Sequence, residues 1–135
     1  MIVLDASAAV EVVLRTELGR RITTPLLEDS APSCPHLIDV EVTQALRRMV
    51  FSGEMEEARA ERALADFTDL PLRRFSHELL LPEVWKLRHN VTPYDAVYVA
   101  LANLLSVPLW TCDLRLARAV EDLITVRTWQ GGGIS

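Results

Sequence analysis

Four acidic side chains occupy positions where carboxylates could act together. Asp5 directly follows a short apolar run at the start of the chain, and Asp113 directly follows a second apolar run near its end. Asp95 lies in the first turn of a helix expected to open at Thr92, and Glu41 lies one turn into another expected helix. These positions make the four carboxylates candidates for one shared site.

Clustered carboxylates favour a particular chemistry. They repel one another and raise each other's pKa, so a cluster is costly unless a cation fills it. Hard oxygen ligands without a nearby histidine or cysteine favour Mg²⁺ or Mn²⁺ over zinc. A bound ion of this kind lowers the pKa of water, orients a phosphate and stabilises charge on the leaving oxygen. The acids therefore predict phosphodiester hydrolysis by a metal-activated water.

Each acid also has a purely structural explanation. Asp5 and Asp113 could cap the helices that follow them. Asp95 comes three residues after Thr92, in a pattern that resembles a capping box. Glu41 could be a solvated helix residue, although it borders an apolar stripe of its helix. Caps scatter around a fold, whereas these four acids are expected at one edge of one sheet, which favours the shared site.

The elements that must position the acids alternate between strands and helices. Ser7 is expected to cap the first helix, and Gly53 is expected just past the end of a long one. The strands are predicted at 2–4, 33–36, 71–75, 108–112 and 124–128, and the helices at 8–15, 18–29, 37–52, 54–68, 77–89, 93–105 and 114–121.

This alternation predicts an α/β domain with a mainly parallel central sheet. In such sheets, functional groups gather beyond the carboxyl ends of the strands. Asp5 and Asp113 each end a predicted strand, and the helix N-termini that carry Asp95 and Glu41 face the same edge. The predicted fold therefore brings the four acids together.

The charge of the chain restricts its binding partners. The net charge is −5, which argues against a general nucleic-acid binder. That objection weakens if several acids hold cations. Of the 14 basic residues only Lys86 is lysine, and arginine suits phosphate and carboxylate better than lysine does. Arg115 and Arg118 follow Asp113 closely and are candidate RNA contacts, although solvated helix arginines explain them equally simply.

The ends of the chain and its cysteines indicate a cytoplasmic protein. The start of the chain lacks the basic region of a signal peptide, and no apolar run is long enough to span a membrane. Cys34 and Cys112 are expected to be reduced thiols. We expect one domain over residues 1–130 and a flexible, glycine-rich tail over 131–135.

Several segments, taken in order, resemble one family. They are MIVLDASAAVE with Asp5, HLIDVEVTQALRR with Glu41, TPYDAVYVALA with Asp95, and LWTCD with Asp113. Together they resemble the PIN-domain nucleases, and more narrowly the VapC ribonuclease toxins of bacterial VapBC toxin–antitoxin pairs. The resemblance covers essentially the whole chain.

The resemblance implies a set of expectations. The fold is a five-stranded parallel sheet between helices, a three-layer PIN-like domain. Asp5, Glu41, Asp95 and Asp113 match the family's acidic quartet, and Ser7 and Thr111 match its neighbouring hydroxyl positions. The activity is that of an endoribonuclease dependent on Mg²⁺ or Mn²⁺, with one or two ions. The partners are an RNA substrate, a VapB-type antitoxin that inhibits the toxin, and often a second copy of the chain.

Three other functions are alternatives to a nuclease for this sequence. A receiver-type phosphotransfer protein needs a lysine at its site, but Lys86 is placed in the middle of a helix. A haloacid-dehalogenase-like phosphatase would carry a second aspartate where this chain has Ser7. A catalytically silent binding module of the same fold stays open, and affinity for Mn²⁺ would discriminate it from an enzyme.

Overall fold

A five-stranded sheet forms the centre of the structure, a computed structural model that describes residues 1–131. The strand order is β3-β2-β1-β4-β5, and every pairing is parallel. The strands are short and match the predicted segments: β1 Ile2–Leu4, β2 Pro32–Pro35, β3 Arg73–Phe75, β4 Leu109–Thr111 and β5 Val126–Thr128.

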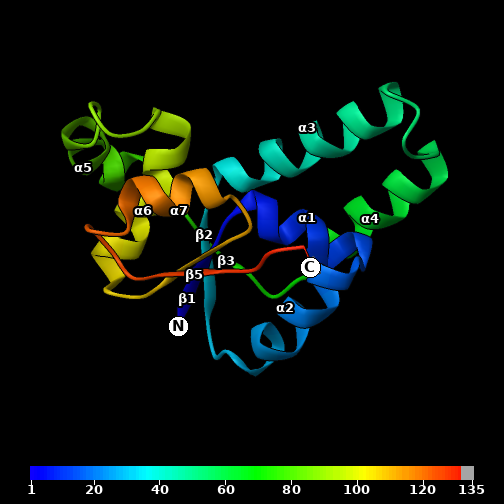
Figure 1. The fold of residues 1–135 in the computed structure, drawn as a ribbon, viewed down its shortest axis with the longest axis horizontal. Coiled ribbons are helices and arrows are strands. Elements are labelled where there is room, and N and C mark those ends of the chain that lie inside the picture. Colours follow the sequence, from blue (N-terminus) through cyan, green and yellow to red (C-terminus); the bar gives the residue numbers. More distant parts are fainter. Residues whose placement is uncertain (132–135) are drawn as a thin grey trace.

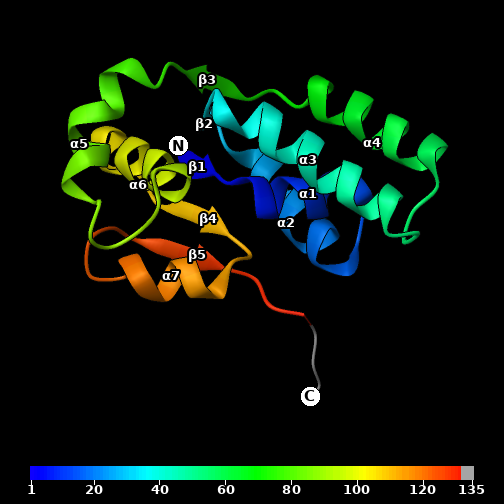
Figure 2. The ribbon, with the colours of Figure 1, turned by 90° about the horizontal axis from the view of Figure 1, so that it is seen from above.

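Helices cover both sides of this sheet. In the described part of the chain α1 to α4 lie on one side, whereas α5 and α6 lie on the other, as Figure 2 shows. The bounds are α1 Ala6–Leu14, α2 Glu17–Glu28, α3 Leu37–Phe51, α4 Glu57–Asp69, a 3₁₀ turn Glu78–Leu80, α5 Leu81–Lys86, α6 Pro93–Leu105 and α7 Leu114–Val120. The prediction of a three-layer α/β domain is therefore confirmed.

The hydrophobic core explains why these segments fold as they do. The central strand β1 is apolar and wholly buried, as a strand covered on both faces must be. Helix α6 is buried along seven successive residues, from Ala96 to Ala102, because it packs across β1 and β2. None of the helices within residues 1–131 is long and apolar enough to cross a membrane.

Helices α3 and α4 form an antiparallel hairpin that extends away from the sheet, at the upper right of Figure 1. The chain turns between them at Gly53, whose φ of 83° favours glycine. The predicted helix end at Gly53 is correct. The predicted start of the next helix at 54 is wrong, because the N–H of Glu54 still bonds the carbonyl of Met49 in α3.

Two other predicted elements need correction. The first helix is capped by Asp5, whose side chain accepts from the N–H of Ala8, so Ser7 lies inside the first turn. The helix predicted over 77–89 is a 3₁₀ turn followed by the short helix α5. Pro82 at the start of α5 lacks an N–H and cannot continue the preceding turn. The predicted tail lies outside the described residues apart from Gly131.

A close approach of two helices fixes α1, whose N-cap residue is the acid Asp5. Gly19, near the start of α2, packs directly on the backbone of Glu11 in α1. A Cβ at this position would overlap the Glu11 carbonyl. The contact is between backbones, so no side-chain rotation can relieve the overlap.

We therefore expect Gly19→Ala to destabilise the fold by about 3 kcal/mol, which would lower the melting temperature by roughly 10 °C. Chemical denaturation followed by circular dichroism measures the change. Gly131→Ala is the matched control, because a Cβ there meets nothing within 4 Å. Equal stability of the two variants would contradict the tight α1–α2 contact.

Candidate functional site

One groove, of about 440 Å³, collects all four acids predicted from the sequence. Asp5 and Asp113 reach it from the ends of β1 and β4, Glu41 from α3 and Asp95 from the first turn of α6. We call it the acid groove. Its lining residues are Asp5, Ala6, Ser7, Val10, Glu11, Glu41, Ala45, Arg48, Met49, Asp95, Tyr98, Cys112 and Asp113.

Asp5 is held by a network that joins the ends of β1 and β4. Asp5 is buried, with only 4% of the residue exposed. Oδ1 accepts from the Ser7 hydroxyl at 2.7 Å and from the Ala8 N–H at 3.0 Å, and Oδ2 accepts from the Thr111 hydroxyl. The Ser7 oxygen in turn accepts from the N–H of Cys112 at 2.9 Å. Ser7 and Thr111 thus lie beside the acid, where the sequence predicts them.

Asp113 and Asp95 occupy helix starts. Asp113 Oδ1 accepts from the N–H of Leu116 and so caps α7. The N–H of Asp95 bonds the hydroxyl of Thr92, which caps α6. The capping explanation and the shared site are therefore compatible, because these bonds use one carboxylate oxygen of Asp113 and only the backbone of Asp95.

Glu41 has a partner that sequence reasoning missed. The Tyr98 hydroxyl donates to Glu41 Oε1 at 2.6 Å, and Tyr98 itself is only 2% exposed. The signal of Tyr98 in the sequence was its spacing from Asp95. Tyr98 follows Asp95 by three residues, so both lie on the same face of α6.

The N-terminus of α3, one turn before Glu41, is anchored by two side chains. His77 Nε2 accepts from the N–H of Leu37 at 2.9 Å, which satisfies one donor of the helix start. Arg74 on β3 forms an ion pair with Asp39 at 2.9 Å. These contacts fix the helix that brings Glu41 to the sheet edge.

Three of the acids have raised pKa values. Burial, together with a smaller effect of the Asp113 charge, raises the pKa of Asp5 to about 6 despite its three hydrogen-bond donors. Burial and then the charge of Asp95 raise the pKa of Glu41. Burial and then the charge of Asp113 raise the pKa of Asp95. The groove therefore concentrates negative charge where water is partly excluded.

The donor chemistry of the groove fits a hard divalent cation. Its charged candidates are carboxylates, and Mg²⁺ takes one or two carboxylates plus water rather than a closed protein cage. Within residues 1–131, no three side chains among the acids, histidines and cysteines form a group that could hold a metal ion by themselves. Cys112 also lines the groove, contrary to the expectation of no nearby cysteine. Burial and the charges of Asp5 and Glu11 raise its pKa to about 12, so it stays a neutral thiol.

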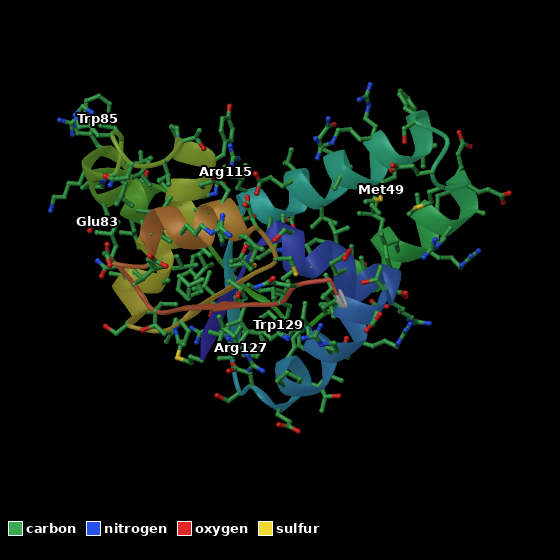
Figure 3. All side chains as sticks on the ribbon, in the orientation of Figure 1. Met49, Glu83, Trp85, Arg115, Arg127 and Trp129 are labelled. Carbon is green, nitrogen blue, oxygen red and sulfur yellow. The ribbon has the colours of Figure 1, made fainter. Side chains whose placement is uncertain are left out.

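The arginines divide between separate surfaces. Arg48 lines the acid groove from α3, near Met49, which Figure 3 labels. Arg115, also labelled there, lines an adjoining hollow that shares Asp95 with the groove. Arg118 lines a different hollow between α7 and β5. Arg47 packs against Phe51, with 4.4 Å from its guanidinium carbon to the ring centroid.

The tryptophans differ in burial, and the cysteines are unpaired. Trp110 and Trp129 are buried, with ring centroids 5.1 Å apart in an edge-to-face contact, whereas Trp85 on α5 is 68% exposed. Cys34 and Cys112 are both free, as predicted. Trp85 is therefore the one tryptophan of the described chain that lies outside the core.

Known proteins are similar to this chain in sequence and in fold. The PIN domain family matches residues 2–122. "Ribonuclease VapC1" of Mycobacterium tuberculosis is 47% identical over 118 residues, which cover 87% of this chain and 89% of that protein. "Ribonuclease VapC12" of the same organism is 40% identical over 119 residues, with 88% and 92% covered.

A solved structure agrees with the fold. It is described as VapBC2 from Rickettsia felis bound to a DNA fragment from their promoter. It superimposes with a TM-score of 0.70 over 96% of this chain and 99% of the matched chain, and only 12% of the residues are identical. At that identity the likeness concerns the fold alone. The match over residues 2–122, the 47% identity and the parallel sheet agree that the chain belongs to the PIN-domain family, among the VapC proteins.

Proposed function

We propose that this protein is an endoribonuclease that depends on a divalent metal ion, and that it is the toxin of a toxin–antitoxin pair. One observation carries the proposal: acids from four separate elements line a single groove in a chain 47% identical to a protein named as a ribonuclease. The family depends in general on divalent cations. The ion proposed for this chain is Mg²⁺ or Mn²⁺, with one or two bound.

Asp5, Glu41, Asp95 and Asp113 are the residues proposed to hold the ion, directly or through water. When bound, such an ion supplies a water of lowered pKa and neutralises charge on the phosphodiester. The raised pKa values of three of these acids support this assignment, because a cation would relieve their repulsion and burial.

The chain's own residues would keep these ligands in place. Ser7 and Thr111 hold the two oxygens of Asp5, and Tyr98 holds Oε1 of Glu41. A ligand whose orientation is fixed loses less freedom when the ion binds. Arg115 and Arg118 on α7 are the proposed RNA contacts. Arg48 is a further arginine, and it lines the acid groove itself.

The proposed partners follow from the relatives. A matched structure is described as a VapBC complex, which supports an antitoxin partner for this chain. The α3–α4 hairpin carries a largely apolar hollow whose lining includes the exposed Phe51, and it offers a surface for such a partner. A homodimer and a cytoplasmic location belong to the same proposal.

Asp5→Asn should reduce RNA cleavage in Mg²⁺ by at least about 100-fold, because it removes a proposed ligand charge. Gel analysis of a labelled RNA measures the loss. Asp66→Asn is the control, since Asp66 is an α4 acid outside the groove. Full cleavage in EDTA, or by Asp5→Asn, would exclude the proposed metal site, and absence of Mn²⁺ binding in calorimetry would favour a silent binding module.

Tyr98→Phe should weaken Mn²⁺ binding by about tenfold, because Glu41 loses the hydroxyl that orients it. Titration calorimetry measures the affinity, and thermal unfolding checks the fold. Tyr94→Phe is the matched control, since Tyr94 lies on the same helix but is 63% exposed. If Tyr98→Phe lowers only the melting temperature, the hydroxyl has a structural role alone.

The raised pKa of Asp5 predicts the direction in which the stability of the fold changes with pH. A carboxyl whose folded pKa lies near 6, above its ordinary 3.8, makes the fold less stable as pH rises through that range. Without divalent cations, Asp5→Asn should therefore gain about 2 kcal/mol of stability relative to the wild type between pH 4.5 and 7.5. Urea denaturation at both pH values measures this, and a pH-independent difference would contradict the buried charge.

A further inference from the structure

A second hollow adjoins the acid groove on the other side of Asp95. Its volume is about 440 Å³, and it lies between the turn before α6 and the exposed face of α7. In Figure 3 the label of Arg115 marks it, to the left of Met49 in the acid groove. Its lining residues are Arg88, His89, Asn90, Val91, Thr92, Pro93, Asp95, Arg115, Leu116 and Ala119.

The two hollows carry opposite charge. The lining of the second contains Arg88 and Arg115 with Asp95 as its single acid, so we call it the basic hollow. The acid groove is lined by five carboxylates and only one arginine, Arg48. In a chain of net charge −5, the basic hollow is a local site where a phosphate is attracted rather than repelled.

Arg88 is held in place before any ligand binds. Its guanidinium carbon lies 4.7 Å from the ring centroid of Trp85, and Nη1 donates to the Trp85 carbonyl at 2.9 Å. An arginine already ordered by stacking and a hydrogen bond loses less entropy when it contacts a phosphate. The exposed Trp85 therefore has a role outside the core: it supports Arg88.

We infer that the basic hollow binds backbone phosphates of a single RNA strand, next to the phosphodiester that the acid groove would cut. This inference rests on the proposed ribonuclease function and adds a substrate site to it. Asp95 lines both hollows, so one continuous strand can occupy them together. Arg88 and Arg115 contact phosphate and carry no base specificity, so they position the strand without selecting its sequence.

The test measures RNA binding and its salt dependence. A labelled single-stranded RNA is titrated in Mg²⁺ against Asp5→Asn protein, which should not cut it, and anisotropy gives the affinity. Adding Arg88→Gln or Arg115→Gln should weaken binding by roughly fivefold and reduce the salt slope by about 0.7, and the double change should reduce it by about 1.4. Arg62→Gln on α4, outside both hollows, is the control of equal charge.

Kinetics in the otherwise unchanged protein provide the second measurement. Arg88→Gln and Arg115→Gln should raise KM and leave kcat nearly unchanged, because the arginines bind the strand away from the reacting atoms. Arg88→Lys, which keeps the charge, should recover part of the salt slope. Circular dichroism confirms that each variant folds.

Other outcomes would overturn the inference in distinguishable ways. If Arg88→Gln and Arg115→Gln bind and cut RNA like the protein without these changes, the basic hollow is not a substrate site and the ribonuclease proposal stands. If light scattering shows that Arg88→Gln changes the number of subunits while the salt slope stays constant, the hollow is a contact between copies. If the unchanged protein neither binds nor cuts RNA, both proposals fail.

Discussion

The parallel pairing of β1 with β4 is the constraint on which the site depends. Its register aligns Leu4 with Trp110, so the next residues, Asp5 and Thr111, meet at the sheet edge and bond through their side chains. A shift of one residue would turn each side chain to the opposite face. Asp5 would then lose the Thr111 hydroxyl as a donor, and Asp113 would leave the groove. The buried apolar side chains of β1 and β4 stabilise this register, and the register places Asp5 and Asp113 at the groove.

The negative charge of the acid groove destabilises the fold that this register supports. Burial raises the pKa of Asp5 to about 6, and its neighbours in the groove add repulsion. The hydroxyls of Ser7, Thr111 and Tyr98 offset part of this cost without neutralising it. A divalent cation would do so, because it supplies the missing positive charge directly. In the proposed function, the same imbalance would give the adjoining arginines a role, because an acidic groove alone would repel a polyanionic substrate.

Much of the architecture could be predicted because it depends on local patterns. Apolar runs identified the buried strands β1 and β4, and the alternation with helices indicated a parallel sheet. Predicted helix ends failed where local chemistry competed, as at Pro82, or where the turn of α3 extends to Glu54. Asp5 rather than Ser7 caps α1, because both residue types suit that position and only the backbone path decides between them.

The sequence by itself determined the family, the parallel sheet and the four acids that share its edge, because strand ends and helix starts are readable from residue order. Only the tertiary structure decided which other residues join them. Tyr98 meets Glu41 across 57 positions, and Arg88 and Arg115 line one hollow, whereas Arg118 faces another. Such pairings arise from the packing of α6 and α7 against distant elements. Spacing along one helix shows which residues share a face, but it does not show which distant residue that face meets.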